Sequence, residues 1–184
     1  QKNENSLKII SVCRIVPIKN IEFLLLVLSQ FEFPLQFTIV GPIEDESYYK
    51  LLLDMIIKLP DYVKVCFKGA LSKEKALECI SESDVFITTS KNENYGHSIA
   101  ESLAMGKPVL VSDATPWCDL EDNYAGYRIP LDIEMYKEKL IHFYHLNNDQ
   151  YSCYNKGARN YYENKINPEQ YKIGYLQLFR NITR

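Results

Sequence analysis

The chain has 184 residues, 46% of them hydrophobic and 24% charged, which is typical of one folded domain and excludes a disordered or fibrous protein. Its 21 basic and 24 acidic residues give a net charge of −3, and the Lys and Arg are scattered, so we expect no nucleic-acid partner. The longest apolar run, residues 23–28, is far shorter than the roughly 20 residues that a membrane span requires.

The five cysteines are odd in number and contain no C-x-x-C pair, so neither a disulfide set nor a zinc site is indicated. We expect reduced, mostly structural thiols in a reducing compartment. No secretory signal is recognisable, which favours a cytoplasmic location, with peripheral membrane association of the full-length protein left open. Because the first residue is Gln1 and not Met, we expect the chain to be a fragment or a processed product.

Short apolar runs alternate with segments of helical periodicity along almost the whole chain. Strands are predicted over residues 7–13, 35–40, 62–67, 84–89, 108–112 and, as an edge strand, 125–129. Helices are predicted over residues 20–31, 44–59 and 72–81, within 90–106 after a loop, and from about 132 onward with breaks near 147–148 and 167–168. Ser72 and the acidic turn at 44–46 are typical of helix N-termini.

Continuously apolar strands that alternate with helices predict a parallel sheet covered on both faces. The predicted fold class is therefore α/β: a doubly wound, mainly parallel, Rossmann-like sheet with helices on both faces and further helices at the C-terminal end. We expect one domain over residues 1–184, with residues 1–6 disordered. No G-x-G-x-x-G follows the first strand, which argues against a redox dinucleotide-binding domain. Ligands of doubly wound sheets bind beyond the carboxyl ends of the strands, so we look for chemistry in the strand-to-helix loops.

Three of these loops carry candidate binding groups. Arg14 and Lys19 follow the first strand, residues 68–71 follow the third, and residues 90–101 follow the fourth. In the last of these, Gly96 permits an unusual backbone conformation, and a helix starts near His97 or Ser98. The free N–H groups of a first helical turn attract an anion, and two cations across the crevice complete a cradle for a diphosphate. Carboxylates at either end, Glu93 and Glu101, suit a molecule with hydroxyls on both sides of a diphosphate, such as a nucleotide sugar.

Glu93 and Glu101 are separated by seven residues with an aromatic-Gly pair between them, and the run 101–112 continues the pattern. Together with the Arg14/Lys19 spacing and Asn20 at a helix start, this resembles the signature of the group 1 family of retaining glycosyltransferases. The matches cover most of residues 7–130. The resemblance implies two Rossmann-like lobes with the active site in the cleft between them, of which this chain is the second, donor-binding lobe. The acceptor lobe is expected before residue 1, residues 167–184 would form a helix that crosses back to it, and the donor lobe alone is expected to be inactive.

The resemblance also implies roles for individual residues. Arg14 and Lys19 would bind the diphosphate and stabilise it as it leaves, Glu93 would contact the sugar ring, and Glu101 would bond the ribose hydroxyls. The implied catalytic residues are therefore Arg14, Lys19 and Glu93. Backbone amides of Tyr95, Gly96 and His97 would hold the distal phosphate. The implied binding set is Arg14, Lys19, Gly69, Ala70, Leu71, Glu93, Asn94, Tyr95, Gly96, His97 and Glu101. Asn94 stands where the family often has Gly, and Cys13 where Gly is common.

The predicted function is transfer of a hexose, with retention, from a nucleotide-diphosphate sugar to a saccharide or lipid-linked acceptor, as in polysaccharide biosynthesis. No Asp-x-Asp occurs, so we expect neither a metal nor another cofactor. A non-catalytic nucleotide-binding module of the same fold and a nucleotide-sugar isomerase are the alternatives.

For four further residues the sequence either allows two interpretations or indicates no functional role. His97 either caps or packs a helix or contacts phosphate, and Trp117 either stacks on a ligand or anchors a loop to the core. His142 and His145 are interpreted as surface residues.

Overall fold

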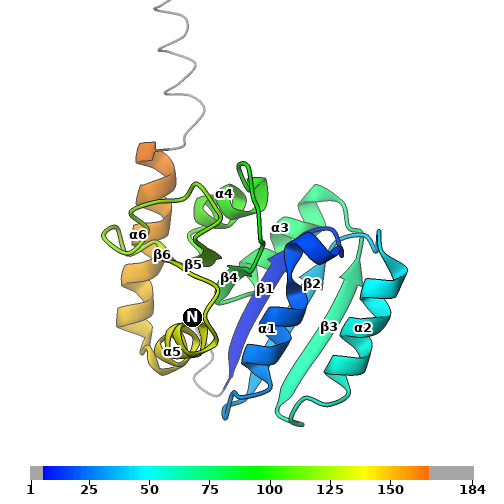
Figure 1. Ribbon diagram of the computed structural model, residues 1–184. Coiled ribbons are helices and arrows are strands. Elements are labelled where there is room, and N and C mark those ends of the chain that lie inside the picture. Colours follow the sequence, from blue (N-terminus) through cyan, green and yellow to red (C-terminus); the bar gives the residue numbers. More distant parts are fainter. Residues whose placement is uncertain (1–5, 166–184) are drawn as a thin grey trace, which may run out of the picture.

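The computed structural model describes residues 6–165 and confirms the predicted fold class. Six parallel strands form one sheet in the order β3-β2-β1-β4-β5-β6 (Figure 1). The strands are β1 (Leu7–Val12), β2 (Leu35–Val40), β3 (Val63–Gly69), β4 (Val85–Thr88), β5 (Val109–Ser112) and β6 (Gly126–Ile129). The helices are a 3-10 turn η1 (Pro17–Lys19), α1 (Ile21–Leu28), α2 (Glu46–Ile56), α3 (Lys73–Ser81), α4 (His97–Ala104), α5 (Ile133–His145) and α6 (Asn148–Lys165).

Every strand and helix predicted within the described residues is present, with ends that differ from the prediction by a few residues. The predicted break near residues 147–148 separates α5 from α6. The predicted break at 167–168, the helix over 167–184 and the start of the chain up to residue 5 lie outside the described residues. No helix within residues 6–165 is long and apolar enough to cross a membrane.

Side-chain caps fix where three of the helices begin. Asp45 accepts a hydrogen bond from the backbone N–H of Tyr48 at 2.8 Å, and Asp132 accepts one from Met135 at 2.9 Å. The Ser72 hydroxyl accepts the N–H of Lys75 at 3.4 Å, which confirms Ser72 as a cap. Such bonds satisfy N–H groups that have no partner inside the helix. They fix the start of each helix and therefore the length of the loop before it.

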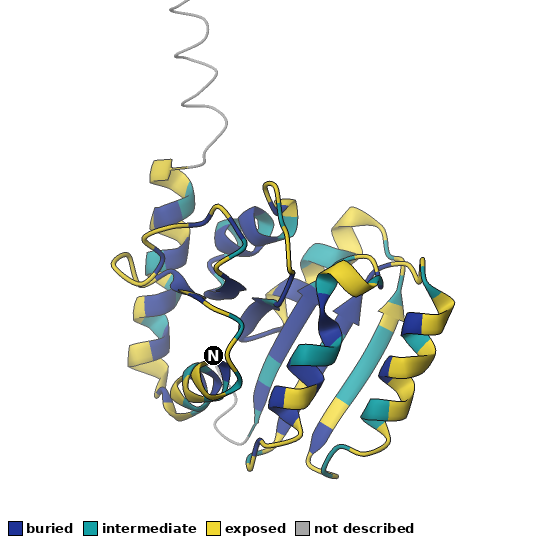
Figure 2. Cartoon of the chain, in the orientation of Figure 1, coloured by how far each residue is buried: buried dark blue, intermediate teal, exposed yellow. Residues whose placement is uncertain are grey.

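Helices cover both faces of the sheet, which explains why the central strands are continuously apolar. Successive residues of β1 enter different cores: Ile9 packs with α1 and α5, whereas Ile10 packs with α3 and α4. Figure 2 shows the central strands as the most buried part of the sheet. Each fully buried aliphatic side chain contributes about 1.5–3 kcal/mol, so the central strands are held firmly and the loops at their ends start from fixed positions.

Glycine 157 lies inside α6 where that helix touches the loop before β6. A Cβ atom added there would meet the carbonyl oxygens of Asn123 and Tyr124 at 2.3 and 2.4 Å. Alanine usually stabilises a helix interior by about 1 kcal/mol relative to glycine, but overpacking typically costs about 1–3 kcal/mol. The cost of overpacking should exceed the gain in helix propensity, because both neighbours are backbone atoms and cannot move aside as a flexible side chain can.

We therefore expect Gly157→Ala to lower the free energy of unfolding by about 1–2 kcal/mol in a urea titration. Asn160→Ala, at an exposed position of the same helix, is the control and should be neutral or slightly stabilising. A Gly157→Ala variant as stable as the Asn160→Ala variant would contradict the close contact between α6 and this loop.

Candidate functional site

The strand order places the candidate site between β1 and β4. The chain leaves β1 toward β2 on one side and leaves β4 toward β5 on the other, so β1 and β4 form the switch point at which doubly wound sheets bind their ligands. Two bonds tie these loops together. The Lys91 N–H donates to the Ile18 carbonyl at 2.9 Å, and the Thr89 hydroxyl donates to the Asn20 carbonyl at 2.9 Å. The two loops that the sequence singled out are therefore neighbours.

Lys19 and Glu93 form an ion pair across this junction. The Lys19 Nζ lies 2.5 Å from Glu93 Oε2, and only 15% and 19% of the two side chains are exposed. Each of these largely buried charges stabilises the other, because an unpaired charge there would lose hydration without compensation. Lys19 is predicted to bind a diphosphate and Glu93 a sugar, and the structure places the two side chains in direct contact. Their spacing in the chain gives no sign of this pairing.

Arg14 lies directly after β1 and is more exposed than Lys19. Its Nη1 lies 2.8 Å from Glu44 Oε2, in the loop after β2. Both side chains are open to solvent, so this ion pair contributes less than about 1 kcal/mol to stability. In the sequence Glu44 looks like part of an acidic helix start, and its pairing with Arg14 was not predicted. The signal that could have found it is its place after β2, at the same edge of the sheet.

The backbone at the start of α4 has the features that favour an anion. Gly96 precedes the helix with φ +78°, and a Cβ there would lie 2.6 Å from Ile99 Cδ1, so another residue would be strained and crowded. Within the described chain, no group accepts a hydrogen bond from the backbone N–H of Tyr95, Gly96 or His97, the three donors predicted for the distal phosphate, or from that of Ser98. These donors and the positive end of the helix dipole favour a bound anion.

Glu101 lies about one turn into α4, as expected, and pairs with Lys73 at the start of α3. The Lys73 Nζ lies 3.4 Å from Glu101 Oε1. Lys73 follows the loop Gly69–Leu71, which leaves β3 beside β2 because the Gly41 N–H donates to the Gly69 carbonyl at 2.8 Å. This ion pair therefore brings the third predicted loop next to α4. Sequence reasoning did not single out Lys73.

A hollow of about 360 Å³ opens beside this ion pair. It is lined by residues of α3, α4 and α6 and by the loop before α4: Lys73, Leu77, Tyr95, His97, Ala100, Glu101, Ala104, Met105 and Tyr162. Its lining combines charged groups, Lys73 and Glu101, with apolar ones such as Leu77 and Met105, which suits a ligand with both kinds of surface.

The aromatic residues of the predicted set differ in their surroundings. Trp117 is 5% exposed, and its indole N–H donates to the Tyr95 carbonyl at 2.5 Å, so the anchoring interpretation of Trp117 is confirmed. Tyr95 itself is exposed, as are Asn94 and His97. The His97 ring lies 5.0 Å from that of Tyr95, and both residues line the hollow beside α4. His142 and His145 are exposed on α5, as expected, and His142 Nε2 also lies 3.1 Å from the Tyr154 hydroxyl.

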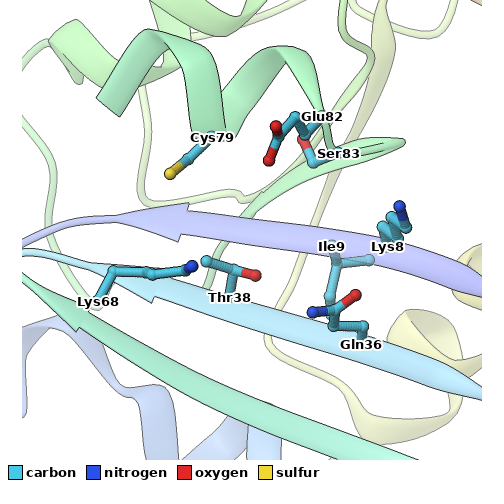
Figure 3. Close-up of a pocket in the computed structure, with 8 residues that line it drawn as sticks. All are labelled: Lys8, Ile9, Gln36, Thr38, Lys68, Cys79, Glu82 and Ser83. Atoms are coloured by element: carbon cyan, nitrogen blue, oxygen red, sulfur yellow. The ribbon is translucent and has the colours of Figure 1, made fainter. Parts of the chain in front are cut away.

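A second hollow, of about 170 Å³, lies on the sheet face beneath α3 (Figure 3). Lys8, Gln36, Thr38 and Lys68 come from the three neighbouring strands, and Cys79 faces them from the helix (Figure 3). None of the predicted site residues lines it. Among residues 6–165 no cluster of His, Cys, Asp or Glu has an arrangement that would hold a metal ion.

Residues 1–160 match the family model of the group 1 glycosyl transferases. The chain belongs to this family. The glycosyltransferase resemblance inferred from Arg14, Lys19, Glu93 and Glu101 is therefore confirmed at the level of the family. No curated protein is similar enough to be recognised as a relative.

Solved glycosyltransferase structures share the fold of the chain. Anabaena Alr3699/HepE in complex with UDP matches with a TM-score of 0.82 and 19% identity, over 96% of this chain and 49% of that one. Thermosynechococcus elongatus sucrose-phosphate synthase matches with a TM-score of 0.79 and 20% identity, over 99% of this chain and 47% of that one. A third match is a mutant of S. aureus TarM in complex with fondaparinux, alpha-GlcNAc-glycerol and UDP. Its TM-score is 0.75 and its identity 22%, over 94% of this chain and 35% of that one. The chain thus spans half or less of the length of these structures.

The thiol of Cys13, next to Arg14, should be unreactive. Burial raises its pKa to about 11, while Lys19 pulls the pKa down more weakly. The thiolate is the reactive form, so at pH 8 roughly one thiol in a thousand is ready to react. We expect iodoacetamide at pH 8 to modify the exposed Cys118 well before Cys13, as followed by peptide mass spectrometry, and the Cys13 rate to rise as the pH approaches 11. In urea both should react alike. Equal rates in the folded protein at pH 8 would contradict this assignment.

Proposed function

We propose that the chain is the donor-binding lobe of a retaining, metal-independent glycosyltransferase. In this proposal a hexose passes from a nucleotide-diphosphate sugar to a saccharide or lipid-linked acceptor. The acceptor lobe would precede residue 1, and this lobe alone would turn over no acceptor. The observation that carries the proposal is the grouping of two cations, two carboxylates and backbone N–H groups that have no acceptor among residues 6–165, all of them in the loops and helix starts that follow β1 and β4.

In the proposed reaction the bond from the anomeric carbon to the diphosphate breaks, and its electron pair stays on the diphosphate oxygen. Negative charge therefore grows on the leaving group. Arg14, Lys19 and the start of α4 would stabilise this charge, which is the task a metal ion performs in other transferases. The acceptor oxygen would form the new bond on the face from which the diphosphate left, and the hydroxyl proton of the acceptor would pass to the departing diphosphate oxygen on that same face.

Donor binding would exchange partners within the site. We propose that the diphosphate and the sugar of the donor meet at the Lys19–Glu93 ion pair. Lys19 would turn to the diphosphate, and Glu93 would accept hydrogen bonds from sugar hydroxyls. Glu101, held by Lys73, would accept hydrogen bonds from the ribose. Each exchange replaces one charge-assisted bond with another, so the carboxylates need not become unpaired.

The first test is a thermal-shift panel of UDP, GDP and ADP with their sugars, followed by calorimetry on the nucleotide that binds. We expect the dissociation constant to change by less than about threefold when EDTA replaces a divalent metal, because cations and backbone N–H groups hold the diphosphate. A loss of about tenfold, or roughly 1.4 kcal/mol, would contradict metal independence. No shift with any of the nucleotides would contradict the donor site itself.

The second test separates the two carboxylates. Glu101→Ala should weaken the nucleoside diphosphate and its sugar conjugate alike, since both contain the ribose. Glu93→Ala should weaken only the sugar conjugate, and the free diphosphate should bind as well as before or better because Lys19 is released. Charge-assisted bonds contribute about 1.5–3 kcal/mol, so losses of roughly 10- to 150-fold are expected. Both sets of constants come from calorimetry.

Two controls accompany this comparison. Lys19→Ala should weaken both ligands, whereas Lys137→Ala, a partly buried lysine paired with Glu134 on α5, should weaken neither. Equal losses for the two ligands in Glu93→Ala would mean that Glu93 does not contact the sugar. Circular dichroism of each variant verifies that the fold is retained.

A further inference from the structure

Trp117 is buried in the loop after β5, yet its one polar atom is directed at the loop before α4. The indole N–H reaches the Tyr95 carbonyl across 22 residues of sequence, at 2.5 Å. In the described part of the chain no other group donates to this carbonyl. The ring of Tyr95 also packs on the indole, with centroids 5.6 Å apart. Trp117 thus contacts both the backbone and the side chain of Tyr95, the residue just before Gly96.

This contact sets the direction of the next backbone donor. The peptide between Tyr95 and Gly96 is planar and trans, so its C=O and N–H point in opposite directions. With the Tyr95 carbonyl held by Trp117, the Gly96 N–H must point away from the indole. Glycine has the widest choice of backbone conformations, and without this contact the peptide could turn. The indole therefore selects one orientation of a flexible peptide.

The indole is itself held from behind by α6. The ring of Tyr161 lies 6.4 Å from that of Trp117, and the Tyr161 hydroxyl donates to the carbonyl of Cys118 at 2.5 Å. Buried apolar neighbours, among them Leu120 and Ala158, belong to the same core cluster. A chain of contacts therefore runs from α6 through Trp117 to the start of α4, and the indole has little freedom to follow the loop if the loop moves.

We propose that Trp117 is a positioning residue for phosphate: it acts through the Tyr95 carbonyl to orient the backbone N–H groups that receive the distal phosphate of the donor. The inference rests on the proposed function, because it assumes that a diphosphate binds at the start of α4. In this proposal Trp117 itself does not contact the nucleotide. Its effect belongs to the second phosphate alone, because the loop lies at the start of α4, whereas Glu101 and Lys73 stand a turn away.

The test compares a nucleoside diphosphate with its monophosphate, using UDP and UMP or the GDP or ADP pair if the thermal-shift panel selects that base. Trp117→Phe keeps an aromatic ring in the core and removes the N–H. We expect it to weaken the diphosphate about tenfold and the monophosphate less than about twofold by calorimetry. Tyr151→Phe is the matched control, since it removes a buried hydrogen bond to the Asp84 carbonyl far from the loop; it should change neither affinity.

Equal weakening of both nucleotides by Trp117→Phe, or no weakening of either, would overturn the positioning role. If the wild-type chain binds neither nucleotide, the proposed function fails and not only this inference. Should Trp117→Phe fail to fold, Tyr161→Phe tests the same contact chain from α6. It should weaken the diphosphate about threefold and leave the monophosphate unchanged, and equal effects on both would again overturn the proposal.

Trp117 is the only tryptophan of the chain, so its indole N–H gives a single resonance that can be followed directly. In the wild-type protein we expect this proton to be protected from exchange with water. The resonance should shift when the diphosphate is added, and by much less with the monophosphate. An indole N–H that exchanges as fast as that of the urea-unfolded chain would show that the bond to Tyr95 does not persist, and would overturn the proposal.

Discussion

The arrangement of the site depends on one ion pair, between Lys19 and Glu93, at the point where the sheet changes its winding direction. Strands β1 and β4 lie side by side although the chain between them forms two other strands. Their following loops must each turn away from the other, which leaves two loop ends with polar groups facing one another. An apolar contact there would offer a polar ligand no group to bind. The ion pair joins the two loops while leaving groups that a polar ligand can recruit.

The same principle extends to the other charged residues of the site. Arg14 pairs with Glu44, and Lys73 pairs with Glu101. A cluster of unpaired cations would repel itself and destabilise the fold, whereas paired cations cost little. A diphosphate must then compete with carboxylates for Arg14 and Lys19, so only part of the attraction between phosphate and cation appears as affinity. In return, the carboxylates released or shared by the ligand are available to hydroxyl groups.

Much of this could be predicted from the sequence, because it depends on local pattern. Apolar runs and helical spacing predicted the sheet, and the position of Arg14, Glu93 and Glu101 just after strands or in a first turn predicted their common edge. The pairings were not predictable, because they join segments that the fold alone brings together. Glu44 and Lys73 look like ordinary first-turn charges in the sequence. Trp117 allowed two interpretations, and only its buried indole beside Tyr95 decides between them.

The backbone donors at the start of α4 differ from the cations in one respect that matters for selectivity. Arg14 and Lys19 already have carboxylate partners, whereas the N–H groups of Gly96, His97 and Ser98 have none within the described residues. A phosphate that reaches them displaces water and no protein group. Salt also screens the exposed Arg14 pair more than it weakens donors fixed in a helix. The orientation of this short stretch of backbone therefore decides how much of the attraction is specific to phosphate, and a buried aromatic residue such as Trp117 can influence binding without contacting the ligand.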